Sequence, residues 1–124
     1  MKNPNDSFLK GRIKSLKFAF KGAYLLITTE HSIMVQFSLG IAVIIFGFIM
    51  DISATEWMFQ LIAIGMVLVA ESLNTGIEKL CDFVHKDYHK RIGFIKDISA
   101  GAATFAAIIA IVIGLIIYIP KFLI

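Results

Sequence analysis

Apolar residues dominate the pattern of this chain and form three long stretches separated by short polar segments. The first covers residues 32–50 and has no charge, the second covers 56–83, and the third covers 98–120. At about 1.5 Å per helical residue, each stretch can cross roughly 30 Å of hydrocarbon. The pattern therefore predicts an all-α membrane protein with three spanning helices.

Residues 8–27 follow a helical pattern with two faces. On a helix that advances about 100° per residue, lysines form one stripe and apolar side chains form another on the opposite side. The lysines are Lys10, Lys14, Lys17 and Lys21, and the apolar stripe is Leu9, Ile13, Leu16, Phe20 and Ile27. This pattern is typical of a helix that lies in the bilayer interface with its lysines against anionic headgroups. Taken alone, the segment also fits an amphipathic helix of a soluble bundle.

Composition agrees with a membrane protein, because 58% of the 124 residues are hydrophobic and only 17% are charged. We expect one domain over residues 1–124. The net charge of +3 comes from basic residues confined to two segments, which favours a lipid bilayer over nucleic acid as the partner. Cys81 is the single cysteine, so an intramolecular disulfide is impossible, and the histidine spacing does not favour zinc.

The basic residues also predict an orientation in the membrane. Eleven of the twelve lie before the first span or between residues 79 and 96. By the positive-inside rule, the amino terminus and the 79–96 loop are cytoplasmic in a multi-pass protein of the cell inner (cytoplasmic) membrane. Residues 51–56 and the carboxyl terminus then face outward, with Trp57 as an interfacial anchor.

A line of polar side chains interrupts the second span. Its members, spaced i, i+3, i+7 and i+11 within an arc of about 80°, are Glu71, Asn74, Glu78 and Asp82. Each carboxylate in hydrocarbon costs about 2.5 to 3.5 kcal/mol, so the line needs a partner, water or a bound cation. Glu30, Lys96 and Asp97 fall at the same depth. Carboxylate and amide oxygens suit Mg²⁺ together with substrate phosphates.

Simpler explanations exist for part of this line. Asp82, Lys79 and Asp97 can be ordinary charges at a helix end, and Asn74 can be a contact between helices. The explanation as an ordinary helix-end charge is weak for Glu71, because fourteen uncharged residues precede it.

Two segments resemble signatures of the prokaryotic diacylglycerol kinase family, which also includes undecaprenol kinases. Glu71-Ser-Leu-Asn-Thr-Gly-Ile-Glu78 followed by Asp82 resembles E-x-x-N-[ST]-[AG]-I-E-x-x-x-D. Lys96-Asp97-Ile-Ser-Ala-Gly-Ala102 resembles K-D-x-x-[AS]-[AG]-A. The resemblance covers nearly the whole chain, and without it nothing in the composition or spacing indicates a kinase, since no P-loop is present.

The resemblance implies a homotrimeric bundle with shared active sites that transfers the γ-phosphoryl group of ATP to a lipid hydroxyl. It implies that Glu71 is the catalytic base and that Glu30 and Glu78 hold Mg²⁺. Residues implied around the nucleotide are Asn74, Asp82, Asp87, Tyr88, His89, Lys96, Asp97 and Arg12. The chain departs from the family in two of these places: Asp87 replaces a glutamate, and Gly11 stands at the offset of the family's arginine, with Arg12 following.

The lipid acceptor is expected to be diacylglycerol, with undecaprenol as the alternative. Two other classes remain open: a small proton-coupled membrane transporter that uses Glu71, and a non-catalytic membrane subunit. ATP hydrolysis that depends on an added lipid alcohol separates the kinase from both.

Overall fold

The computed structural model describes residues 3–123 and is entirely helical in that range. Its helices are α1 (Phe8–Thr29), α2 (His31–Ile49), α3 (Ala54–Val84) and α4 (Lys90–Leu123). The last three are long and apolar enough to cross a membrane, which confirms the three predicted spanning helices.

The helices α3 and α4 are longer than a bilayer requires. With 31 and 34 residues, they extend roughly 46 and 51 Å at about 1.5 Å per residue. The helix α4 begins at Lys90, eight residues before the expected start of the third span, because the basic segment ahead of the apolar run is itself helical. Both helices are therefore longer than the roughly 30 Å of hydrocarbon that a span crosses.

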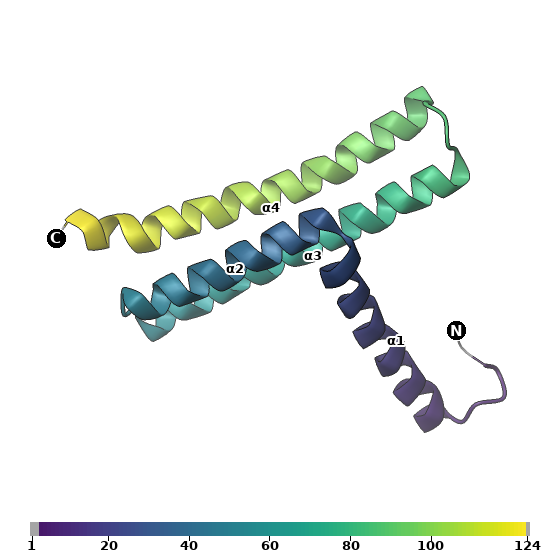
Figure 1. The fold of residues 1–124 in the computed structure, drawn as a ribbon, viewed down its shortest axis with the longest axis horizontal. Helices are drawn as coiled ribbons and strands as arrows, with labels where there is room; N and C mark the ends of the chain where they lie inside the picture. The colour runs from purple at the N-terminus through teal and green to yellow at the C-terminus, as the bar shows by residue number, and fades with distance from the viewer. Residues whose placement is uncertain (1–2, 124) are drawn as a thin grey trace.

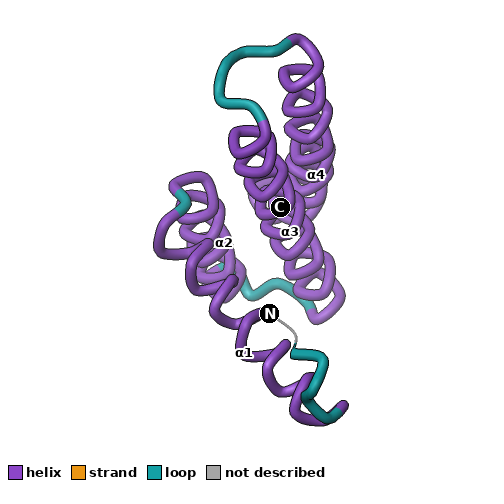
Figure 2. Tube along the Cα trace, turned by 90° about the vertical axis from the view of Figure 1, so that its right-hand side faces the viewer, coloured by secondary structure: helices purple, strands orange, loops and turns teal. Residues whose placement is uncertain are grey.

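The long helices lie side by side, and α1 leaves them at a steep angle (Figure 1). Helices α3 and α4 form an antiparallel hairpin, and α2 packs along the first part of α3. Figure 2 shows the same separation of α1 from the hairpin. The change of direction falls at Glu30, whose extended backbone (φ −105°, ψ 113°) makes it both the C-cap of α1 and the N-cap of α2.

Glycines allow close contact between α2 and α3. A Cβ atom at Gly47 would lie 2.9 Å from the Trp57 ring, and one at Gly40 would lie 3.0 Å from Cγ2 of Ile64. On α4, the small residues Ser99, Ala103 and Ala106 are buried, and small side chains let helices approach closely. Many large apolar side chains elsewhere are exposed, as expected for surfaces that face lipid.

At the end of the bundle where α3 starts and α4 ends, polar contacts form within α3 and between the two helices. Ser53 and Glu56 form a capping box: Glu56 N donates to Ser53 Oγ (3.2 Å), and Ser53 N donates to Glu56 Oε1 (2.9 Å). Glu56 also pairs with Lys121 of α4 at 3.1 Å. One turn deeper, the hydroxyl of Tyr118 donates to the side-chain oxygen of Gln60, which is 3% exposed. These contacts connect the ends of α3 and α4.

Candidate active site

The polar line of α3 continues the face by which this helix packs in the bundle. Gln60, Ala63 and Val67 are buried, and at about 100° per residue they share one arc with Glu71 and Glu78. The same face is thus apolar over the first half of the helix and acidic near its end. Packing against α2 and α4 therefore points the acids toward the other helices.

Glu71 lies deeper than the other carboxylates of α3. Counting about twenty spanning residues from Trp57 places Glu71 within the hydrocarbon and Glu78 just beyond it. Glu71 is half-buried, whereas Glu78 and Asp82 are exposed. A carboxylate at this depth is expensive unless it faces a polar cavity or a partner, which is why it indicates a functional site.

Asn74 lies one turn from Glu71, and its side-chain oxygen has no hydrogen-bond donor among the described residues. Its Oδ1 atom is buried and has no hydrogen-bond partner within residues 3–123. Buried polar atoms are almost always satisfied, so an unsatisfied one calls for a ligand, water or ion. This oxygen lies between the two glutamates in sequence and offers a third oxygen donor on the same face.

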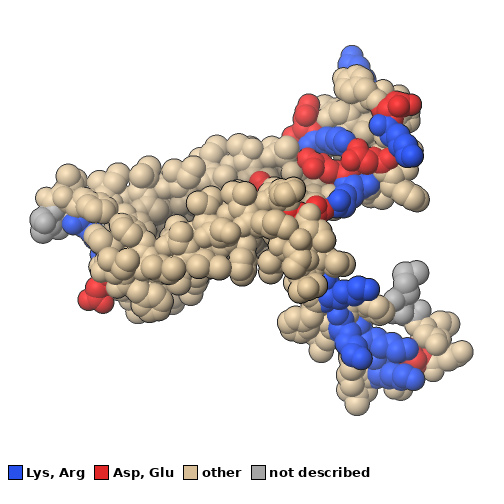
Figure 3. Space-filling view, viewed as in Figure 1, with Lys and Arg blue, Asp and Glu red and all other residues tan. Residues whose placement is uncertain are grey.

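Two ion pairs bring neighbouring helices to the acidic end of α3. Lys79 Nζ lies 2.7 Å from Glu30 Oε1 and thereby connects α3 with the start of α2. Lys96 Nζ lies 2.5 Å from Asp82 Oδ1 and connects α4 with α3. The predicted residues Glu30, Asp82 and Lys96 are therefore gathered at one end of the bundle, where Figure 3 shows acidic and basic side chains interleaved.

The predicted nucleotide loop is not joined to this cluster. Asp87, Tyr88 and His89 are exposed in the segment between α3 and α4. Its polar contacts are internal: His85 Nδ1 donates to the Asp87 carbonyl oxygen (2.7 Å), and the backbone N–H of Arg91 donates to His89 Nδ1 (3.1 Å). The loop is shaped by its own hydrogen bonds and flanks the acids.

Asp97 and Arg12 also stand apart from the acidic line. Asp97 is exposed on α4. Arg12 is exposed on α1 and lines a small cavity of about 250 Å³ together with Asp6 and Lys14. Lys14 Nζ is 2.7 Å from Asp6 Oδ2, so this cavity belongs to the amino-terminal turn. In Figure 3 the basic patch of α1 is separate from the cluster on α3 and α4.

The donor set suits a divalent cation that brings further ligands with it. Within the described part of the chain, no three His, Cys, Asp or Glu side chains converge closely enough to hold a metal on their own. Mg²⁺ usually takes one or two carboxylates and completes its shell with water and substrate phosphates. Glu30, Glu78 and the unsatisfied Asn74 oxygen meet that requirement in chemistry and number.

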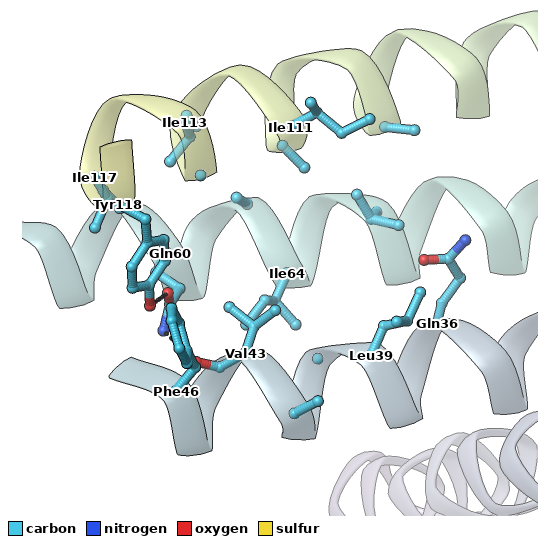
Figure 4. Close-up of a pocket in the computed structure, with 17 residues that line it drawn as sticks. Gln36, Leu39, Val43, Phe46, Gln60, Ile64, Ile111, Ile113, Ile117 and Tyr118 are labelled. Carbon is cyan, nitrogen blue, oxygen red and sulfur yellow. Dashed lines mark hydrogen bonds between the residues drawn. The ribbon is translucent and has the colours of Figure 1, made fainter. Parts of the chain in front are cut away.

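An apolar cavity of about 700 Å³ lies between α2, α3 and α4 (Figure 4). Leu39, Val43 and Ile64 line its middle, with Gln36 toward one end and the Gln60–Tyr118 pair toward the other (Figure 4). Its last α3 residue is Val67, one helical turn before Glu71. The cavity thus ends about one helical turn from Glu71.

Two polar residues of this architecture were not assigned a role from sequence. From sequence, Lys79 fits an ordinary charge at a helix end, and the structure pairs it with Glu30. Gln60 is a lone amide within the uncharged run of residues 57–70, and polar side chains at membrane depth usually pair across helices. The run itself was the signal that could have identified Gln60.

Three helices long and apolar enough to cross a membrane, with acidic side chains near one end of the bundle, define a multi-pass membrane protein. Residues 17–118 match the family model of prokaryotic diacylglycerol kinase. This chain belongs to that family, and it is a diacylglycerol-kinase-like lipid kinase.

Individual relatives carry two names. The undecaprenol kinase of Bacillus subtilis is 35% identical over 108 residues, which cover 87% of this chain and 88% of the relative. The diacylglycerol kinase of Synechocystis is 28% identical over 110 residues, covering 88% of this chain and 63% of the relative. The diacylglycerol kinase of Escherichia coli K12 is 26% identical over 103 residues, covering 81% and 82%. These similarities do not favour the transporter alternative.

Proposed function

We propose that this lipid kinase transfers the γ-phosphoryl group of ATP to the hydroxyl of undecaprenol. The observation that carries the choice of acceptor is the 35% identity with an undecaprenol kinase over nearly the full length of both chains, against 28% and 26% for the diacylglycerol kinases. This order is the reverse of the one expected from the family resemblance alone. Diacylglycerol is the second candidate, supported by the family description and by those two relatives.

Glu71 is the general base in this proposal. Its carboxylate is half-buried, and in the proposal a lipid hydroxyl would reach it from the bilayer. It accepts the hydroxyl proton as the oxygen attacks the γ-phosphorus, and the bond from that phosphorus to the β,γ-bridging oxygen breaks. A positioned base of this kind contributes about 10²- to 10⁴-fold to the rate.

The remaining polar residues position the phosphates. Glu30 and Glu78 would hold Mg²⁺, with the Asn74 oxygen beside them, and when bound the ion would neutralise charge on the transferred group. Lys96, now paired with Asp82 at 2.5 Å, offers an ammonium to the polyphosphate. Phosphoryl transfer depends mainly on positioning and charge neutralisation, so this small set is chemically sufficient.

The apolar cavity accounts for the lipid part of the acceptor. It begins one turn from Glu71 and is lined almost entirely by apolar side chains of α2, α3 and α4. A long isoprenoid chain can lie there while its hydroxyl reaches the carboxylate. ATP arrives from the other side, at the charged end of the bundle.

The setting in the membrane follows from charge. The lysines of α1 and the basic residues near 79–96 support a cytoplasmic location for the amino terminus and the acidic site, in the inner membrane. The steep departure of α1 supports an interfacial position for that helix. A homotrimer with shared active sites would supply the protein surface that one chain lacks around the acids.

The test is a phosphorylation assay of the purified chain in mixed micelles with ATP, offering undecaprenol, diacylglycerol and glycerol separately and in competition. We expect phosphate transfer to undecaprenol to be fastest and glycerol to be a poor acceptor. The Glu71→Gln variant serves as the control for contaminating kinases. Faster transfer to diacylglycerol would reverse the choice of acceptor, and efficient phosphorylation of glycerol would contradict entry of the lipid from the bilayer.

A further inference from the structure

Lys79 holds a carboxylate that the proposed function assigns to the metal. Its ammonium lies 2.7 Å from Glu30 Oε1. This ion pair connects α3 with the residue between α1 and α2. The two side chains differ in exposure: Glu30 is 17% exposed and Lys79 is 68% exposed. The carboxylate side chain is therefore mostly covered, while the lysine side chain is mostly exposed.

The position of Glu30 is determined by its backbone hydrogen bonds as well as by the burial of its side chain. It is the single non-helical residue between α1 and α2, with its N–H donating to Leu26 O (3.3 Å) and its carbonyl oxygen accepting from Met34 N (2.9 Å). Both helices therefore determine where its side chain starts. A lysine, in contrast, carries a compact charge on a flexible four-carbon stem.

An ammonium and a divalent cation compete for such a carboxylate. Both bind its oxygens directly, and their like charges repel at contact distance in a partly desolvated site. Asp82 and Lys96 form a similar pair, but Asp82 is 60% exposed and is not an assigned metal ligand. Of these two ion pairs, only Lys79–Glu30 therefore places an ammonium in competition with the cation for a proposed metal ligand.

We propose that Lys79 is a positioning residue that occupies Glu30 in the nucleotide-free enzyme and is displaced when the divalent cation binds. The proposal rests on the proposed function, in which Glu30 is a metal ligand. Until the cation arrives, the lysine holds the enclosed carboxylate in place and neutralises it. Displacement would free the ammonium from Glu30 while the carboxylate turns to the cation.

The experiment measures binding of Mn²⁺ alone by electron paramagnetic resonance, using the full chain in detergent micelles. Lys79→Met removes the competing charge and keeps most of the stem, so we expect Mn²⁺ affinity to rise by about 2- to 5-fold, the range set by an exposed ion pair. Lys79→Arg keeps the charge and should match the parent. Lys121→Met is the matched control, because it breaks the 3.1 Å pair with Glu56 between helices at the opposite end.

The sign of the change separates displacement from a structural role. If Lys79 only braced Glu30, its removal would leave Mn²⁺ affinity unchanged or weaken it, and either result would overturn the proposal. Lys79→Gln provides a second uncharged variant should the methionine protein fail to fold. Glu30→Gln separates the two levels of inference: if it binds Mn²⁺ as the parent does, or if the parent binds none, the metal role of Glu30 itself fails and the displacement fails with it.

Discussion

Glu71 combines a depth and a chemistry that no other residue of the chain shares. It is half-buried on the packing face of α3, one turn beyond the apolar cavity and one turn before the unsatisfied Asn74 oxygen. Lys79 and Lys96 are each paired with a different acid. Neither of these ion pairs involves Glu71.

Glu71→Gln tests the role of the base. The amide has the same shape but cannot take the hydroxyl proton, so we expect kcat to fall by at least about 10²-fold while ATP binding is kept. Turnover with undecaprenol and equilibrium binding of a non-hydrolysable ATP analogue measure the two effects. Glu56→Gln, at the opposite end of α3, should retain turnover within a few-fold. A folded Glu71→Gln enzyme with nearly normal kcat would refute the assignment.

Glu30→Gln and Glu78→Gln test the proposed metal ligands. Each substitution removes one carboxylate charge from a site that has few ligands, so the Mg²⁺ concentration for half-maximal activity should rise by about 10-fold or more. Titration of activity with Mg²⁺ at fixed ATP measures the shift. Asp51→Asn changes an exposed acid in the turn between α2 and α3 and should leave the titration unchanged. Parent-like Mg²⁺ curves for both glutamine variants would remove these residues from the metal site.

At the scale of the elements, two features hold the site in place. The capping box at Ser53 and the Glu56–Lys121 pair determine where α3 starts relative to the end of α4. Close contacts of Gly40 and Gly47 then set how near α2 approaches α3. Because Glu30 begins α2, its distance from Lys79 and Glu78 depends on that approach.

Gly47→Ala tests this dependence. The added methyl group would lie 2.9 Å from the Trp57 ring and 3.0 Å from Gln60 Nε2, so a rigid contact must shift. We expect the free energy of unfolding to fall by about 1 to 3 kcal/mol, the usual cost of overpacking. Denaturant unfolding in detergent micelles measures it. Gly65→Ala is the control, since its new Cβ would have no neighbour within 4 Å. Equal midpoints for the two variants would contradict tight packing at Gly47.

At the scale of the whole molecule, one chain encloses little. No large side chain among residues 3–123 is completely buried, and α1 has no buried residue in that range. The acids lie at an open end of the bundle, with an apolar cavity on one side and exposed charge on the other. Such a chain offers too little surface to surround both a nucleotide and a lipid.

We therefore expect activity to require an oligomer, with three copies as the family resemblance implies. Crosslinking and native mass measurement in a mild detergent should show a trimer in every active fraction. Mixing Glu71→Gln and Glu78→Gln chains at a Mg²⁺ concentration too low to support the Glu78→Gln enzyme provides a further measurement. Sites shared between subunits would regain part of the activity if the two residues act from different chains. An active monomer would overturn the expectation.

The sequence by itself determined the class of the fold and the position of the acids along it. Three apolar runs predicted three membrane helices, and the i, i+3, i+7 spacing placed Glu71, Asn74 and Glu78 on one face, because both depend only on local helical geometry. The motifs also indicated the family, which the match over residues 17–118 confirms.

Tertiary structure decided which polar groups are paired and which are left free. The Lys79–Glu30 pair, the Gln60–Tyr118 pair and the unsatisfied Asn74 oxygen all depend on how helices far apart in sequence approach one another. Hydropathy could not predict them, because in a lipid environment apolar faces have almost no hydrophobic preference for one another over lipid. The approach is set instead by small residues and interhelical polar contacts, whose partners become known only when the helices are packed.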